Sequence, residues 1–321
     1  KTEIMPNADA IINPKRKDCI YPFKNLCGAG VAFKFVQILY KEFKIDIKES
    51  FELLEFASIA TVCDVVDLLD ENRIIVKKGL ELINSTKNKG LKELIKVKKI
   101  DGKEISEYHF GFVIGPCINA TGRLEIADIS LELLITEDEE RAKELAIKLN
   151  ELNEKRQELT VESTEKVIEK VENDLKDDEK VIFVYEDSIH ESIAGIVAGR
   201  VREKYNLPTI VMTKGSDMPK GSGRSIEEYN MFEELSKCKE LIYKFGGHPM
   251  AAGLSVKEEN LPILKKKLND NCTLTEDDVT RKIIIDAALP LEYINFELVD
   301  RLNDMRPFGK GNGSPMLAVK D

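Results

Sequence analysis

The chain has 321 residues, of which 42% are hydrophobic and 33% charged, and its formal net charge is −10. This composition is typical of a soluble globular protein of two or three domains, and the apolar runs are too short for a membrane span or a signal peptide. The six cysteines form no CxxC pair and no ligand-like cluster with the three histidines, which argues against a zinc knuckle or disulfide framework and predicts reduced thiols in a cytoplasmic protein.

The first part of the chain is predicted to be helical. Residues 29–43 carry apolar residues at helical spacing behind Cys27-Gly28, and residues 51–62 resemble a second, buried helix. The glycine-rich entry to the first helix is compatible with anion binding and with close helix packing.

Two acids, Asp64 and Asp67, follow the second helix within an apolar run. Asp64 is flanked by valines and a cysteine, so we expect it to be at least partly buried. A buried carboxylate needs a hydrogen bond, an ion pair or a cation. A helix N-cap is an equally good interpretation.

Residues 136–176 lack Gly and Pro and are rich in Glu, Lys, Leu and Ala, which predicts one long helix or two abutting ones. Such a helix spans about 60 Å and suits a connector between two domains. The negative net charge disfavours a polyanionic partner, but much of the acid lies in residues 137–179. A basic groove elsewhere is therefore compatible with the sequence.

Strands and helices alternate beyond this connector, which predicts an α/β domain with a mainly parallel sheet. The expected strands are residues 181–185 and 209–212, and the expected helices are residues 191–205, 231–243 and 258–268. His190 precedes the first of these helices, at a position where α/β proteins place ligands. Gly195 and Gly199 are spaced along that helix as expected for close packing.

Two glycine-rich polar clusters predict a phosphate pocket. The first is the loop Lys220-Gly221-Ser222-Gly223-Arg224-Ser225, and the second is the stretch 246–253, Gly-Gly-His-Pro-Met-Ala-Ala-Gly. Glycines let the backbone approach a ligand closely, and a guanidinium matches two phosphate oxygens.

The pattern changes again after Lys282. A short apolar strand precedes a short helix and the segment Arg306-Pro307-Phe308-Gly309-Lys310-Gly311-Asn312, and residues 316–319 begin another strand. A domain does not usually end just after a strand has begun, so we expect the chain to be a fragment.

Taken in order, these motifs resemble the RecJ-type single-stranded-DNA-specific exonucleases of the DHH phosphoesterase superfamily. The segments that carry the resemblance are 6–14, 26–32, 60–66, 115–124, 190–200, 220–225 and 246–253. The resemblance implies an α/β fold with four parts. These are the C-terminal part of a DHH domain (1–135), a connecting helix (136–178), a DHH-associated substrate-binding domain (179–275) and the beginning of an OB-fold domain (276–321).

The resemblance also implies roles for individual residues. Asp64 matches the last metal-binding aspartate of a catalytic site that holds two Mn or Mg ions. His248 matches a catalytic residue that also contacts phosphate. The other positions expected to bind substrate or phosphate are Arg224, Ser225, Gly246, Gly247, His190, Asn119 and Arg123, although Arg123 equally suits a helix C-cap.

The sequence departs from the family pattern in two places. The DHH triplet and the earlier acidic metal motifs would lie before Lys1, so we expect one aspartate here where two metals need several ligands. Cys117 stands where the family usually has arginine, which puts a phosphate-binding role at that position in doubt.

The function implied is metal-dependent hydrolysis of single-stranded DNA from the 5′ end, in DNA repair and recombination. We expect this chain to be a monomer that binds nucleic acid weakly without cleaving it, with single-strand-binding protein or a helicase as candidate partners. One alternative is a phosphodiesterase for short RNA or cyclic dinucleotides, against which the OB-like entry after Lys282 argues. The other is a non-catalytic replication scaffold, against which the retained Asp64, Arg224 and His248 argue.

Overall fold

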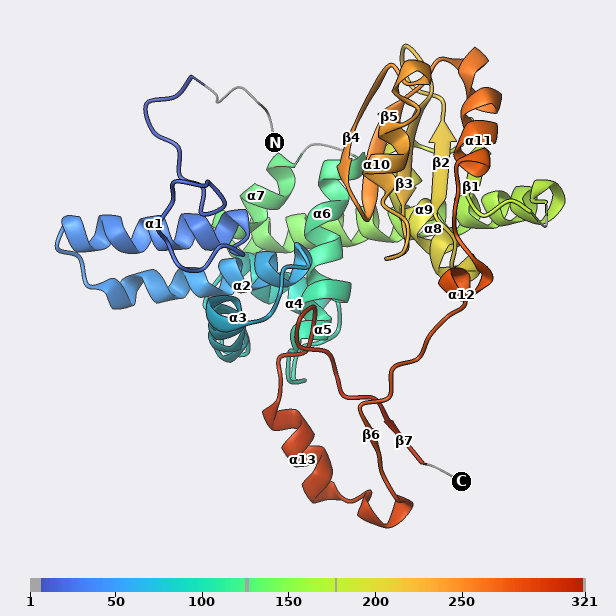
Figure 1. The fold of residues 1–321 in the computed structure, drawn as a ribbon. Coiled ribbons are helices and arrows are strands. Elements are labelled where there is room, and N and C mark those ends of the chain that lie inside the picture. The colour runs from blue at the N-terminus through green and yellow to red at the C-terminus, as the bar shows by residue number, and fades with distance from the viewer. Residues whose placement is uncertain (1–6, 125–126, 177, 320–321) are drawn as a thin grey trace. The chain divides into compact units, whose positions relative to one another are not determined.

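A computed structural model describes residues 7–124, 127–176 and 178–319 of the chain (Figure 1). They form two compact units. Among the described residues, one unit, the helical unit, contains residues 7–122, 127–151 and 284–319, and the other, the sheet unit, contains residues 123–124, 152–176 and 178–283. No helix within the described ranges is both long and apolar enough to cross a bilayer.

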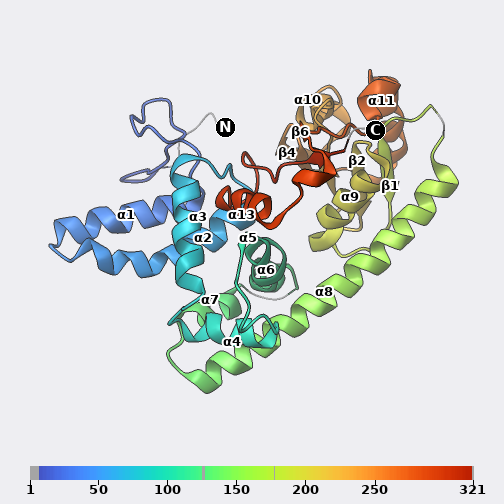
Figure 2. The same ribbon diagram turned by 90° about the horizontal axis from the view of Figure 1, so that it is seen from below.

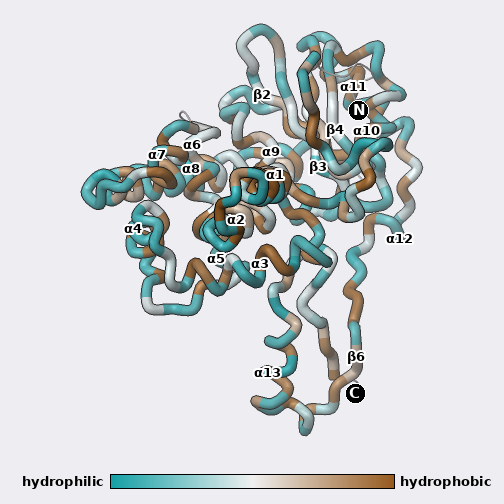
Figure 3. The backbone as a smooth tube through the Cα atoms, turned by 90° about the vertical axis from the view of Figure 1, so that its left-hand side faces the viewer, coloured by the Kyte–Doolittle hydropathy of each residue, from teal (hydrophilic) through white to brown (hydrophobic). Residues whose placement is uncertain are grey.

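The helical unit is built mostly from short helices (Figure 2). Its elements are α1 (Gly28–Glu42), a 3-10 helix (Ile47–Leu53), α2 (Leu54–Cys63), α3 (Asp70–Ile83), α4 (Lys89–Val97), α5 (Glu107–His109), a π-helical stretch (Phe110–Ile114), α6 (Gly115–Leu124), α7 (Asp128–Ile135) and the first turns of α8 (Glu139–Asp174). Helix α2 packs against α1 and α3. Most of its residues are hydrophobic (Figure 3) and six of its ten residues are buried, which explains its central position.

The segment 115–124, which carries part of the resemblance, is the helix α6. Gly115 is needed there because a Cβ at this position would lie 2.2 Å from the Cys63 sulfur. The glycine of this motif therefore serves helix packing.

The sheet unit contains a five-stranded sheet of order β1-β2-β3-β5-β4. Its strands and helices are β1 (Ile182–Tyr185), α9 (Glu191–Tyr205), β2 (Thr209–Thr213), β3 (Lys220–Arg224), α10 (Met231–Ser236), a 3-10 turn (Lys239–Leu241), β4 (Lys244–His248), β5 (Ala251–Ser255), a 3-10 turn (Glu258–Asn260), α11 (Leu261–Asp270) and α12 (Glu276–Val279). Helix α10 is shorter than the predicted helix 231–243.

Helices cover the two faces of this sheet. Phe183, Ile210 and Met212 point into a core shared with α10 and α11, whereas Ile182, Val184 and Val211 point into a core shared with α8 and α9. This alternation follows from the two-residue period of a strand. On the second face, α9 packs against β2 and β3.

The prediction of a mainly parallel sheet was wrong, because β1 and β2 are the one parallel pair among the described strands of this five-stranded sheet. The other three pairs are antiparallel. Residues 220–224, expected to be a loop, form β3, and two residues, Pro249 and Met250, join β4 to β5. A connection this short allows only an antiparallel hairpin.

Helix α8 is one continuous helix of 36 residues, roughly 54 Å long. Its first turns bury Leu145, Ala146 and Leu149 in the core of the helical unit. Val167 and Val171, near its other end, lie in the core of the sheet unit. One helix therefore belongs to two hydrophobic cores.

The C-terminal segment is grouped with the helical unit. It contains β6 (Ala287–Ala288), a 3-10 turn (Leu291–Tyr293), α13 (Phe296–Asp304) and β7 (Leu317–Ala318). Strands β6 and β7 pair in parallel.

An ion pair between Lys170 of α8 and Glu186, the residue after β1, should make the stability of the sheet unit depend on pH in acid. The Lys170 Nζ lies 2.7 Å from the Glu186 carboxylate, and hydrogen bonds from Lys170 and Ser188 lower the pKa of Glu186 from 4.5 to about 2. Because the unfolded state takes up this proton first, the stabilisation is present above pH 4.5 and lost as the pH falls towards 2. We expect Glu186→Gln to lower the free energy of unfolding at pH 7, with the difference from wild type shrinking towards pH 2 in urea titrations. An equal difference at both pH values would contradict this prediction.

Candidate functional site

One face of the sheet carries aligned polar side chains, which we call the polar face. Its members come from β3, β4 and β5 and share the side of the sheet that α9 occupies: Lys220, Ser222, Arg224, Lys244, His248 and Ser255. Arg224 pairs with Ala251 of β5, which in turn pairs with His248 of β4. Directly paired residues project from the same face, so Arg224 and His248 lie on one row, about 10 Å apart across two strand spacings. The structure thus brings together two residues that the sequence placed in one pocket.

Helix α9 supports the Arg224 side chain. A Cβ at Gly195 would lie 2.6 Å from the Arg224 Nη2 atom and 3.3 Å from the Ser222 hydroxyl, and a Cβ at Gly199 would lie 4.0 Å from the Arg224 Cγ. The guanidinium also donates a hydrogen bond of 2.7 Å to the Gly223 carbonyl. The lack of a side chain at Gly195 therefore leaves room for the Arg224 guanidinium between α9 and the sheet.

His248 is exposed at the end of β4. Its Nδ1 atom accepts a hydrogen bond of 3.3 Å from the Met250 N–H. In the neutral ring this leaves the proton on Nε2, so the imidazole presents a donor on its other side. A donor of this kind suits a phosphate oxygen.

The glycines between these side chains leave bare backbone. A Cβ would meet nothing within 4 Å at Gly246 or Gly253, which are paired with each other. Both line a pocket of about 450 Å³ together with Ser192, Lys220, Ser222 and Lys244. Lys220 is held 2.9 Å from Glu191, whereas Lys244 is exposed. Gly247 differs, since a Cβ there would lie 2.3 Å from the Ala251 carbonyl oxygen.

Two predicted phosphate contacts have structural partners. The Ser225 side chain is 1% exposed, and its hydroxyl donates a hydrogen bond of 2.6 Å to the Tyr229 carbonyl. His190 is the N-cap of α9, where its Nδ1 accepts a hydrogen bond from the Ser192 N–H and lies 2.7 Å from the Ser192 hydroxyl. These contacts favour positioning roles for both residues. Ser222, which belongs to the predicted polar cluster but was not assigned a phosphate contact, lines the pocket.

In the helical unit, Asp64 and Asn119 line one pocket of about 190 Å³ with Cys63 and several apolar residues. Asp64 is exposed and is the C-cap of α2, so the expected partial burial and the N-cap interpretation were both wrong. The reason is that the chain turns away after α2, with Val65 at a positive φ of 52°. Burial and the negative charge of Asp64 raise the pKa of the Cys63 thiol to about 11, so this cysteine is a neutral thiol at pH 7.

The remaining predicted positions add little to this pocket. Cys117 is fully buried in the core of the helical unit, which gives it a packing role. Arg123 lies in α6, but its side chain falls outside the described residues.

The described residues do not fit a divalent metal pair by themselves. No three His, Cys, Asp or Glu side chains gather around a common point in this part of the chain. Asp64 supplies one carboxylate, whereas Mg and Mn ions are held by several oxygen ligands.

Substituting Gly195 should weaken ligand binding at the polar face without lowering the stability of the fold. Gly195→Ala adds a methyl group where the Arg224 guanidinium now lies. The flexible guanidinium can move aside, while alanine favours the helix by up to about 1 kcal/mol. We expect unchanged or higher thermal stability and weaker binding of a phosphate-bearing ligand, measured by calorimetry. Gly199→Ala, whose methyl group would make only an ordinary contact, is the control, and equal affinities of the two variants would contradict the assignment.

Comparison with known proteins gives a consistent result. Residues 178–273 match the DHHA1 domain, and residues 285–321 match the RecJ OB domain. The chain is 39% identical over 321 residues to the single-stranded-DNA-specific exonuclease RecJ of Bacillus subtilis, covering 99% of this chain and 40% of that protein. It is 31% identical to RecJ of Escherichia coli, covering 98% of this chain and 58% of that protein.

The chain is also similar to solved structures. The crystal structure of RecJ in complex with Mg²⁺ from Thermus thermophilus matches 94% of this chain and 46% of its own, with a TM-score of 0.82 and 28% identity. A Mn²⁺ complex of RecJ from the same organism matches with a TM-score of 0.81. The chain thus spans about half the length of the proteins it matches.

Proposed function

We propose, on the premise that the chain belongs to the RecJ family of single-stranded-DNA-specific exonucleases, that its polar face binds the phosphates of single-stranded DNA. The alignment of Arg224 and His248 on one row of the sheet carries this proposal. A guanidinium and an Nε2–H group can each donate a hydrogen bond to a phosphate oxygen, and the exposed glycine backbone lets a DNA strand approach closely.

The charge of the chain is compatible with this role. The net charge is −10, but the polar face contributes three cationic side chains, Lys220, Arg224 and Lys244, of which Lys220 is paired with a neighbouring acid, Glu191. Local charge governs contact with a polyanion when the remaining charges are farther away than the screening length of about 8 Å in physiological salt. The RecJ OB match at residues 285–321 supports a long strand as the ligand, since OB folds bind single strands.

We further propose that Asp64 and Asn119 belong to the site of hydrolysis. Asp64 would provide one oxygen ligand to a divalent cation, as implied by the Mg²⁺ and Mn²⁺ complexes of the T. thermophilus relative. Because the described residues do not complete such a site, we infer that the chain binds single strands without cleaving them. We infer 5′ to 3′ cleavage in DNA repair and recombination for the corresponding full-length enzyme.

Binding and cleavage can be tested on the same purified chain. We expect a fluorescent 5′-phosphorylated oligonucleotide to bind with an affinity that falls as salt rises, and to stay intact in the presence of Mn²⁺. Fluorescence anisotropy and denaturing gels measure the two properties. Manganese-dependent shortening of the oligonucleotide would refute the second expectation, and absence of salt-sensitive binding would refute the first.

A further inference from the structure

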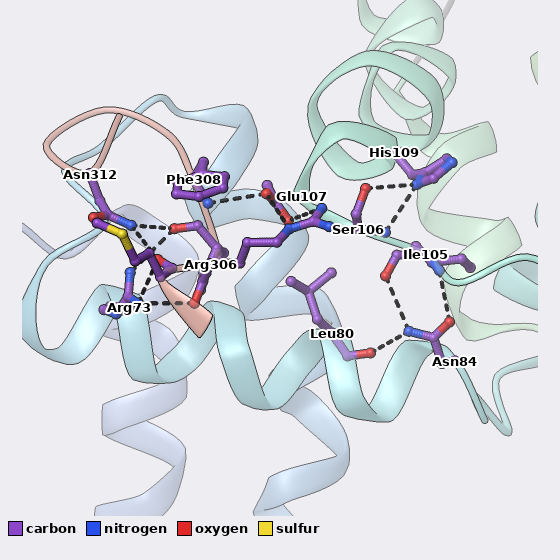
Figure 4. Close-up of polar contacts among 12 residues, drawn as sticks. Arg73, Leu80, Asn84, Ile105, Ser106, Glu107, His109, Arg306, Phe308 and Asn312 are labelled. Carbon is purple, nitrogen blue, oxygen red and sulfur yellow. Dashed lines mark hydrogen bonds and ion pairs between the residues drawn. The ribbon is translucent and has the colours of Figure 1, made fainter. Parts of the chain in front are cut away.

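A loop of the C-terminal segment, residues 305–312, is bound by side chains of the helical unit (Figure 4). The Arg306 guanidinium donates two hydrogen bonds to the Glu107 carboxylate, of 3.1 and 3.0 Å, and the Phe308 N–H donates a third, of 3.1 Å, to the same carboxylate. The Glu107 side chain is only 10% exposed. The Glu107 carboxylate therefore accepts three hydrogen bonds from the loop.

Arg73 of α3 holds the same loop by its main chain. Its guanidinium donates hydrogen bonds to three successive carbonyl groups, those of Met305 at 2.7 Å, Arg306 at 2.9 Å and Pro307 at 3.3 Å. Asn312 closes the loop on itself by donating to the carbonyls of residues 305 and 307. Such contacts depend on the loop conformation more than on its side chains.

Packing completes the fit. The Leu68 N–H donates a hydrogen bond of 2.7 Å to the Lys310 carbonyl. A Cβ at Gly309 would lie 2.7 Å from a methyl group of Leu68, and Gly311 has a positive φ of 76° beside Asp67 and Leu69. The two glycines thus allow a close approach and a turn that other residues would resist.

We propose that Glu107 and Arg73 form a socket for residues 305–312, and that this socket positions the RecJ OB segment for binding long single strands. The second half of the proposal rests on the proposed function. The loop lies within the stretch that matches the RecJ OB domain, and its partners lie on α3 and α5. A DNA strand that contacts both the OB segment and the pocket of Asp64 and Asn119, which lies in the same unit, binds through two linked sites, and linked sites reinforce each other only while their separation is restrained.

Hydrogen exchange measured by mass spectrometry tests the socket without DNA. We expect Glu107→Gln to accelerate exchange of the amides of residues 308–310 by about tenfold, because the charge-assisted bonds are lost. Glu104→Gln removes the same charge from an exposed neighbour and is expected to leave exchange unchanged. Amides of α9 serve as the internal reference for global unfolding. Equal exchange of the loop in the two variants would overturn the socket.

Binding then tests the positioning role. We expect Glu107→Gln to weaken binding of a strand of roughly 20 nucleotides by about tenfold, and to leave binding of a strand of about four nucleotides unchanged. Arg73→Lys, which keeps the charge but loses the fork of donors, should show the same split. Faster exchange with unchanged affinity for the long strand would overturn positioning. If the wild-type chain binds neither strand, the proposed function and the positioning role both fail, while the exchange result still decides whether the socket exists.

Discussion

Arg224→Ala should weaken binding of single-stranded DNA by about 1 to 3 kcal/mol, a factor of roughly 5 to 150. The guanidinium lies on the polar face against Gly195, on the same sheet row as His248. Losing a phosphate contact should also reduce the slope of log affinity against log salt by about one. Anisotropy titrations at several salt concentrations measure both quantities.

The matched control is Arg200→Ala. Arg200 lies on α9, is exposed and does not line the pocket of the polar face, so its removal changes the charge of the sheet unit by the same amount. We expect a much smaller loss of affinity in this variant. Similar losses in both variants would mean that overall charge, and not the polar face, governs binding.

Two adjacent glycines of β4 should give opposite results when each is replaced by alanine. A methyl group at Gly247 would lie 2.3 Å from the Ala251 carbonyl and 2.7 Å from the Ala252 Cα, so we expect Gly247→Ala to lower the free energy of unfolding by about 1 to 3 kcal/mol. A methyl group at Gly246 would enter open space on the polar face. We expect Gly246→Ala to keep its stability and to bind single strands more weakly, because the methyl group blocks close approach.

Urea unfolding and anisotropy, measured on both variants, separate these effects. The pair is internally controlled, since both changes are Gly to Ala in the same strand and differ only in the direction of the added methyl group. Unchanged affinity of a stable Gly246→Ala protein would show that the bound DNA does not contact this part of the sheet.

The sequence predicted the helices α1, α8 and α9 well because their patterns are strong, whereas α3, α4 and α7 were not predicted. Residues 29–43 and 191–205 show helical spacing, and the Gly-free and Pro-free run 136–176 contains α8. Strands β3 and β4 were not predicted as strands. Their sequences, Lys-Gly-Ser-Gly-Arg and Lys-Phe-Gly-Gly-His, are rich in glycine, which has low strand propensity, and they lack the apolar alternation that marks a half-buried strand.

The candidate site was predictable in composition but not in geometry. Glycines beside Arg224 and His248 indicated a phosphate pocket, and these two residues do share a sheet face. The sequence could not show that the Ser225 hydroxyl is bound to the Tyr229 carbonyl, because that bond depends on how the chain turns after β3. The pairing of Glu107 with Arg306 was missed for a similar reason, since nothing local marks an acid whose partner lies far along the chain.

The continuous helix α8 has a thermodynamic consequence. Its residues pack into both hydrophobic cores, and its central turns are hydrogen-bonded to the turns on either side. If either core melts, the half of α8 packed there loses its tertiary support, and fraying advances along the helix towards the other core. Denaturation of the two units is therefore coupled through this helix, and a helix-breaking residue in its middle would split one cooperative transition into two.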